Sequence, residues 1–145
     1  MKYAIAICLL FSYVCGYSQK TNDTLAIKTL LEKESATWRS GDAKGHADCW
    51  KVEPYSIIIV STADGKAFEV PASAMIQASP AMGKGGTSVN SNYKMSIHGD
   101  NAWVTHNEES TGKDDIKSYS YEMKILEKID GEWKLVAQSI HLYKP

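Results

Sequence analysis

The end of the chain, residues 116–143, places two long apolar runs on either side of Asp130-Gly131. Asp-Gly between alternating runs favours a tight hairpin turn, because both central residues tolerate a positive φ that matches the twist of the flanking strands. Strands of this length need a second layer of structure to cover one face. We therefore predict a closing β-hairpin around which the rest of the fold is organised.

The covering layer is predicted from the first part of the chain. Ile27, Leu30, Leu31 and Trp38 recur at helical spacing, and Gly41 ends this amphipathic helix. A second, shorter helix is predicted after the capping residue Asp42, with Ala43, His46, Ala47 and Trp50 on it. Pro71 opens a third short helix that includes residues 74–76.

The remaining segments are predicted as strands and turns. Residues 55–62 and 66–70 form a hairpin around Asp64-Gly65, and residues 88–98 and 102–110 precede the closing hairpin. Helices are thus segregated from a run of sequential antiparallel strands. This order predicts an α+β fold, with the first helix covering one face of the sheet.

The N-terminus reads as an export signal. Lys2 precedes an apolar run over residues 3–14, and Gly16 and Ser18 supply small residues before a cleavage site. We predict a signal peptide over residues 1–18, cleavage between Ser18 and Gln19, and one domain over residues 19–145 that is periplasmic or secreted. A lipoprotein signal at Cys15 is the alternative, which the bulky Val14 disfavours.

Charge and cysteine content narrow the classes of function. The formal net charge of −1, without a basic stripe or polybasic segment, argues against nucleic acid or an anionic membrane as partner. Removal of the signal peptide takes Cys8 and Cys15 with it and leaves Cys49, so an intramolecular disulfide is excluded. Cys49 reads as a packed side chain, with a nucleophile as the alternative.

Four stretches of the chain carry a resemblance to a known fold family. They are the opening helix 26–39 with Gly41-Asp42, residues 47–50 leading into Pro54-Tyr55, residues 99–104 and residues 125–136. Together they resemble the nuclear transport factor two-like (NTF2-like) superfamily, which includes ketosteroid isomerase, scytalone dehydratase and the SnoaL-like cyclases. More narrowly, the chain is similar to small exported bacterial members.

The resemblance implies a fold and a place for a site, and it leaves the chemistry open. It implies N-terminal helices packed on a strongly curved, mainly antiparallel sheet, the cone-shaped cystatin-like fold. A pocket is expected at the open end of the cone. Members of the superfamily use that pocket as an enzyme site, as a ligand site or in a protein interface, so the fold does not choose among these.

Two histidines are the candidate catalytic residues. His141 shares strand parity with Trp133, Ala137 and Ser139, where the resemblance implies a polar side chain pointing into the cone. His106 alternates with Glu108 on one strand face and could act as a carboxylate-oriented base. The alternatives are a structural histidine near the chain end and a solvated polar face. No aspartate stands out as the strand-borne base of the isomerases.

Six aromatic side chains are the candidate ligand-binding residues: Trp38, Trp50, Tyr55, Tyr93, Tyr119 and Tyr121. They offer stacking surface and hydroxyl donors, although aromatic residues at alternating strand positions also serve as core. We expect no cofactor. We also expect no metal site, because His98, His106 and His141 lack the local spacing of ligand motifs.

The closing hairpin also predicts a subunit contact. Its last strand is apolar on both faces, and only one face can meet the helix. Since monomers rarely expose large apolar patches, we expect a homodimer through the sheet face. The leading hypothesis is an exported domain that binds a small, partly apolar ligand. The alternatives are an acid–base enzyme of the isomerase, dehydratase or cyclase type, and a dimeric interaction domain.

Overall fold

The computed structural model describes residues 22–145 as one layer of helix packed on one β-sheet. The predicted signal peptide and its cleavage site lie outside the described residues. The first helix is described over residues 22–40. The remaining elements, in chain order, are α2 (Ala43–Ala47), β1 (Ile58–Ser61), β2 (Ala67–Val70), the 3₁₀ helix η1 (Ala72–Ile76), β3 (Thr87–His98), β4 (Asn101–Thr111), β5 (Lys117–Ile129) and β6 (Glu132–Tyr143).

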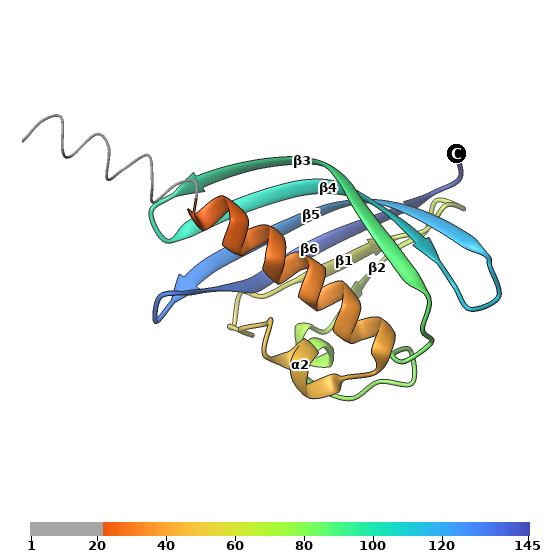
Figure 1. Ribbon diagram of the computed structural model, residues 1–145, viewed down its shortest axis with the longest axis horizontal. Helices are drawn as coiled ribbons and strands as arrows, with labels where there is room; N and C mark the ends of the chain where they lie inside the picture. The colour runs from red at the N-terminus through yellow and green to blue at the C-terminus, as the bar shows by residue number, and fades with distance from the viewer. Residues whose placement is uncertain (1–21) are drawn as a thin grey trace, which may run out of the picture.

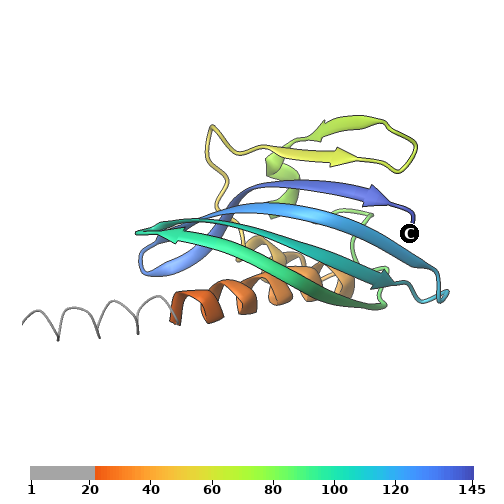
Figure 2. The same ribbon diagram turned by 90° about the horizontal axis from the view of Figure 1, so that it is seen from above.

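The six strands form a single open sheet in the order β2-β1-β6-β5-β4-β3. Every neighbouring pair is antiparallel except β1 and β6, which run parallel. The long helix crosses one face of the curved sheet, and α2 and η1 lie at its far end (Figures 1 and 2). We call the face under the helix the inner face and the opposite one the outer face. The predicted α+β architecture is confirmed.

The closing hairpin has the predicted turn. Asp130 and Gly131 both have positive φ, 53° and 84°, and they join β5 to β6. This two-residue turn matches the right-handed twist of the strands it connects. The prediction of a tight turn at Asp130-Gly131 is therefore confirmed.

Two β-bulges bend the sheet and change which side chains face inward. In β6, Leu135 pairs with Leu126 and Ala137 with Ile125, so Val136 has no partner opposite it. In β3, residues 92 and 93 together stand opposite His106, and Asn92 has a φ of 55°. Each extra residue shifts the alternation of the strand by one position.

Part of the hydrophobic core lies on the inner face beneath the first half of the long helix. Ile27 and Leu31 of the long helix are almost fully buried in one cluster with Val104, Leu126 and Leu135. Towards the other end of the strands, the inner face becomes polar. The helix therefore covers an apolar floor at one end and a hydrophilic surface at the other.

A close backbone approach holds the end of the long helix over this polar region. The N–H of Gly83 donates to the carbonyl of Trp38, and that of Gly85 donates to the carbonyl of Arg39. Gly41, with a φ of 80°, would bring an added Cβ within 3.0 Å of Gly83 Cα. Glycine at position 41 therefore allows both the left-handed helix end and the contact. Among residues 22–145, no helix is long and apolar enough to span a membrane.

Candidate functional site

A pocket of about 480 Å³ opens between the end of the long helix, η1 and the inner face of the sheet. One part of its wall is apolar and is formed by Trp38, Ile58, Val60, Val70, Met75, Ile140 and Leu142. The other part is polar and includes Glu34, Arg39, Glu108, Ser120, Glu122, Lys124 and Gln138. We call this cavity the inner pocket, and its two sides offer different chemistry to a ligand.

Lys124 is the centre of the polar wall. Its Nζ lies 2.9 Å from Glu34 Oε2, 3.1 Å from Glu122 Oε2 and 3.1 Å from Gln138 Oε1. Glu34 comes from the long helix, while the other groups come from β5 and β6. The inner-face register brings them together, since Lys124 pairs directly with Gln138. The ammonium group thereby donates hydrogen bonds to Glu34 and Gln138 and forms an ion pair with Glu122.

Both members of the Glu34–Lys124 pair are held in their charged forms. Burial alone would raise the pKa of Glu34, but Lys124 and His46 outweigh it and lower that pKa to about 2. Burial likewise opposes the charge on Lys124, yet Glu122 and Glu34 raise its pKa well above the ordinary value. A buried ion pair of this kind is stable only because each charge has its partners in place.

His46 extends the network on the helix side. Its Nδ1 lies 2.8 Å from the carbonyl oxygen of Met75, and its Nε2 lies 3.2 Å from Glu34 Oε1. Both neighbours accept hydrogen bonds, so the ring donates through both nitrogens, which is the arrangement of the imidazolium ion. Trp38 and Trp50 lie beside the ring, with centroids at 5.1 and 6.4 Å. Aromatic faces near a cation are favourable surroundings.

His106, one of the two predicted catalytic histidines, is buried beneath the polar wall. It is 1% exposed, stacks on Tyr93 with ring centroids 5.3 Å apart, and has Nε2 3.7 Å from Glu122 Oε2. Among the described residues, neither ring nitrogen has a hydrogen-bond partner. Burial, followed by the nearby charge of Lys124, lowers the pKa of His106. The ring is therefore a neutral imidazole, and its nearest carboxylate is Glu122 rather than the predicted Glu108.

A second ion pair closes the pocket on the side of β4. Arg39 Nη2 lies 2.5 Å from Glu108 Oε1 and also donates to the hydroxyl of Ser110. The other carboxylate oxygen, Glu108 Oε2, accepts a hydrogen bond from Ser35 on the long helix. These contacts fix the helix to β4 and fill the gap between them with polar side chains.

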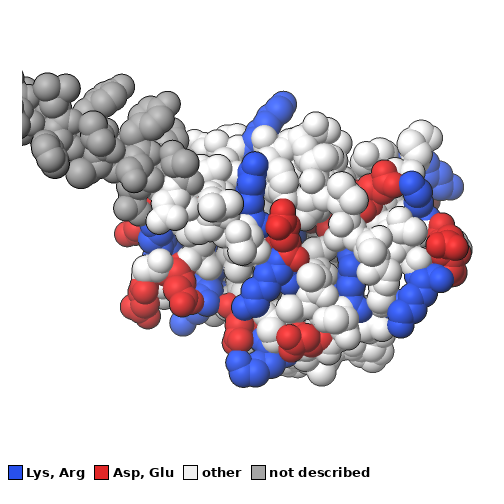
Figure 3. Space-filling view, in the orientation of Figure 1, with Lys and Arg blue, Asp and Glu red and all other residues white. Residues whose placement is uncertain are grey.

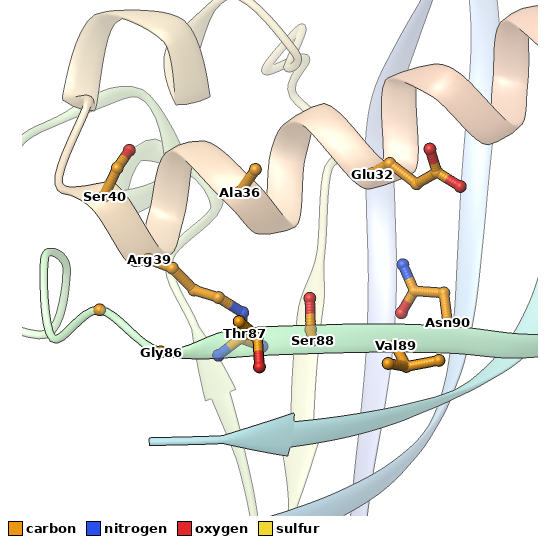
Figure 4. A pocket seen from close by; sticks show the side chains of 10 residues that line it. Glu32, Ala36, Arg39, Ser40, Gly86, Thr87, Ser88, Val89 and Asn90 are labelled. Carbon is orange, nitrogen blue, oxygen red and sulfur yellow. The ribbon is translucent and has the colours of Figure 1, made fainter. Parts of the chain in front are cut away.

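On the other side of Arg39 lies a more open groove of about 610 Å³ (Figure 4). Glu32, Ala36, Arg39 and Ser40 line it from the helix, and residues 85–90 line it from the start of β3. Figure 4 shows Arg39 reaching from the helix to the strand. Arg39 lines both hollows, so its pairing with Glu108 forms part of the wall between them.

The predicted pocket wall of Tyr119, Tyr121 and His141 lies elsewhere. Tyr121 and His141 pair across β5 and β6 on the outer face, where both are exposed, and Tyr119 pairs with Tyr143. For the two tyrosines, the reason is that the alternating residues Ser118 and Ser120 of β5 face the pocket instead. For His141, the reason is the bulge at Val136, which reverses the parity of β6. Trp133 and Leu135 face inward, but after the bulge Gln138, Ile140 and Leu142 do so. A ligand-binding role for the three residues stays a prediction, with no support from the inner pocket.

The other predicted aromatic residues fall in three environments. Trp38 lines the inner pocket. Trp50 and Tyr93 are packed beside His46 and His106. Tyr55 is exposed, and its hydroxyl donates to Glu127, away from the pocket.

Cys49 is buried and donates to the carbonyl of Gly45, and burial raises the pKa of its thiol to about 11, as expected for a packed cysteine.

Sequence reasoning missed the charged residues of the site. Glu34 stands three positions after Leu31 and four before Trp38, so it lies within the apolar stripe of the helix. An acidic residue at such a position indicates a buried carboxylate. In β5, Ser120, Glu122 and Lys124 alternate with Tyr121, Met123 and Ile125. Tyr119 and Tyr121 were predicted to bind a ligand, whereas Ser120, Glu122 and Lys124 are the residues of this strand that line the inner pocket. No group of three or more His, Cys, Asp or Glu side chains in residues 22–145 is arranged to hold a metal.

Neither a family model nor a curated protein matches the sequence. Solved structures do resemble the fold. An NTF2-like protein with a cystatin-like fold from Novosphingobium aromaticivorans superposes with a TM-score of 0.66 at 14% identity, covering 89% of this chain and 87% of its own. A candidate dehydratase of the NTF2-like family from Streptomyces avermitilis superposes with a TM-score of 0.69 at 13% identity, covering 87% and 99%.

A third similar structure is a candidate Ca/calmodulin-dependent kinase II association domain from Exiguobacterium sibiricum. It superposes with a TM-score of 0.59 at 13% identity, covering 85% of this chain and 95% of its own. At these identities the likeness establishes the fold alone. The chain therefore has the NTF2-like, cystatin-like fold that its sequence resembles.

Proposed function

We propose that this NTF2-like chain is an exported domain that binds a small, partly apolar molecule in its inner pocket. The observation that carries the proposal is the two-sided wall of a 480 Å³ cavity, in which aliphatic side chains and Trp38 face a network of paired charges. Ligand sites are typically clefts of a few hundred cubic ångströms that combine apolar surface with a few fixed polar groups.

The rigidity of the polar wall also supports binding. Glu34, Lys124 and Gln138 hold one another in fixed positions before any ligand arrives. A site whose polar groups are already oriented loses less conformational entropy when it binds. The geometry supports binding over acid–base catalysis, because His106 is 1% exposed and does not line the pocket, and His141 lies on the outer face.

The proposal is tested with a pocket-filling variant. Val70 lines the pocket from the edge strand β2, where it is partly buried against the core, so Val70→Trp places a large ring in the cavity. The matched control is Val89→Trp on β3, where the side chain is 65% exposed. We expect the uncharged fluorescent probe N-phenyl-1-naphthylamine to bind the wild type and the control equally, and Val70→Trp at least about tenfold more weakly. Equal binding by all three proteins would contradict the proposal.

A second function is favoured by the outer face of the sheet. Trp103, Met123 and Ile125 lie there on adjacent strands and are each 41–45% exposed. Tyr121 extends the same patch, and exposed apolar surface of this kind marks an interaction site. We propose that it binds a second copy of the chain. The similarity to an association domain fits this proposal through the fold only.

The test of the dimer is sedimentation of the domain at micromolar concentration. We expect a dimer for the wild type and a monomer for Met123→Glu, because a charge in a packed interface has no partner. Leu25→Glu is the control, since Leu25 is exposed on the long helix and away from the patch. A wild type that sediments as a monomer would remove the proposal.

A further inference from the structure

The positive and negative charges around the inner pocket are equal in number. Among residues 22–145, the pocket lining contains three carboxylates, Glu34, Glu108 and Glu122, and two cations, Arg39 and Lys124. The third cation is His46, which lies behind Glu34 and faces hydrogen-bond acceptors at both ring nitrogens. His106, below Glu122, is neutral, because burial and Lys124 lower its pKa.

From this balance we infer that the ligand of the inner pocket is an uncharged molecule that carries hydroxyl or carbonyl groups along one side and an apolar surface along the other. The inference rests on the proposed ligand-binding function and adds the chemical class of the ligand. The contacts on both walls support it.

A charged ligand finds no counterion in this pocket. Lys124 already contacts Glu34, Glu122 and Gln138, and Arg39 already contacts Glu108. An ion that entered would lose its hydration without gaining an unpaired opposite charge, which is unfavourable in a buried site. A ligand that displaced one member of a pair would leave the other member buried and uncompensated.

An uncharged polar ligand meets suitable partners. Ser118 and Ser120 line the pocket beside the carboxylates. The Ser120 hydroxyl donates to Glu122 Oε1, so its oxygen is the part that could accept a hydrogen bond from a ligand. Gln138 uses its carbonyl oxygen on Lys124, so its amide N–H groups are the part of the side chain that could donate to a ligand. Ile140 and Leu142 continue the same strand as apolar wall. A ligand with hydroxyl or carbonyl groups on one edge of an apolar ring would hydrogen-bond to the polar wall and pack against the apolar wall.

The experiment uses three probes of nearly one shape and different charge: 2-naphthalenemethanol, 2-naphthylmethylammonium and 2-naphthoate. Binding to the folded domain at pH 7 is followed by amide chemical shifts, with Gln138 and Ser120 as reporters of the inner pocket. We expect the alcohol to bind at least about tenfold more tightly than either ion, because only the ions lose hydration without compensation.

Two variants change the charge balance in opposite directions. Glu108→Gln leaves one positive charge in excess, so the affinity for naphthoate relative to the alcohol should rise roughly tenfold to a hundredfold. His46→Gln leaves one negative charge in excess and should favour the naphthylmethylammonium ion instead. Glu108 is the less buried of the two residues, with 13% of its side chain exposed. If His46→Gln does not fold, Glu108→Gln alone tests the charge balance.

The outcomes separate this inference from the proposed function. If an ion binds the wild type more tightly than the alcohol, or if Glu108→Gln does not shift selectivity towards naphthoate, the inference is wrong while small-molecule binding stands. If none of the three probes shifts the pocket reporters of the folded wild type, the proposed function fails and the inference fails with it.

Discussion

Replacing Lys124 with methionine removes the central cation of the polar wall and keeps a flexible side chain in its place. The residue is 4% exposed, and Glu34 and Glu122 lie 2.9 and 3.1 Å from its Nζ. In the variant both carboxylates stay buried without this partner. Breaking a buried ion pair in this way costs about 3–5 kcal/mol. Because His46 still contacts Glu34, we expect a loss near the lower end, about 3 kcal/mol.

The assay is urea unfolding at pH 7, followed by tryptophan fluorescence. The matched control is Lys117→Met, which makes the same change on the same strand. Lys117 is 54% exposed and pairs with the exposed Glu109, so its loss should change the free energy of unfolding by no more than about 0.5 kcal/mol. A domain of this size has a total stability of roughly 5–15 kcal/mol, so a loss of 3 is readily measured.

Acid supplies the signature that separates charge from packing. In Lys124→Met, the uncompensated carboxylates take up protons as the pH falls, so the stability gap to the wild type should narrow below about pH 5. A gap that stayed constant with pH would show that lost packing, not lost charge, causes it. A loss at pH 7 of less than about 1 kcal/mol, or one equal to that of Lys117→Met, would refute the reasoning.

Two further predictions concern single groups. The pKa of Glu34 is about 2 in the fold against an ordinary 4.5, so the unfolded chain binds more protons between these pH values. The stability that Glu34 contributes is present above about pH 4.5 and is lost as the pH falls towards 2. At about 1.4 kcal/mol for each pKa unit, the loss is roughly 3–4 kcal/mol, measured as a slope of stability against pH in acid that Glu34→Gln should lack. Cys49, buried with a thiol pKa of about 11, should resist iodoacetamide at pH 8 in the folded protein and react in urea. Equal reaction rates in the two states would contradict its burial.

Several elements were predictable because their signals are local. The spacing of Ile27 and Leu31 predicted a helix that buries one stripe, and that stripe packs in the core. Asp130-Gly131 predicted a turn with two positive φ angles, and both are present. Such features depend on a few neighbouring residues, so the sequence states them directly.

The faces of the strands were not predictable to the same degree. Parity counted from Trp133 assigned His141 to the pocket, but the unpaired Val136 shifts every later side chain of β6 to the other face. A bulge depends on how two strands align, and the residues around Val136 contain no local pattern that predicts one. The polar alternation of Glu122 and Lys124 was visible in the sequence, yet it reads equally well as a solvated face.

By itself, the sequence determined the order of helices and strands, the α+β class and the closing hairpin, because hydrophobic periodicity and turn chemistry act over short distances along the chain. Only the tertiary structure decided the site. Lys124 and Glu34 are 90 residues apart and meet because the helix lies across the strands. Their charges are stable in the interior only in each other's presence, so the chemistry of the pocket is a property of the assembled fold.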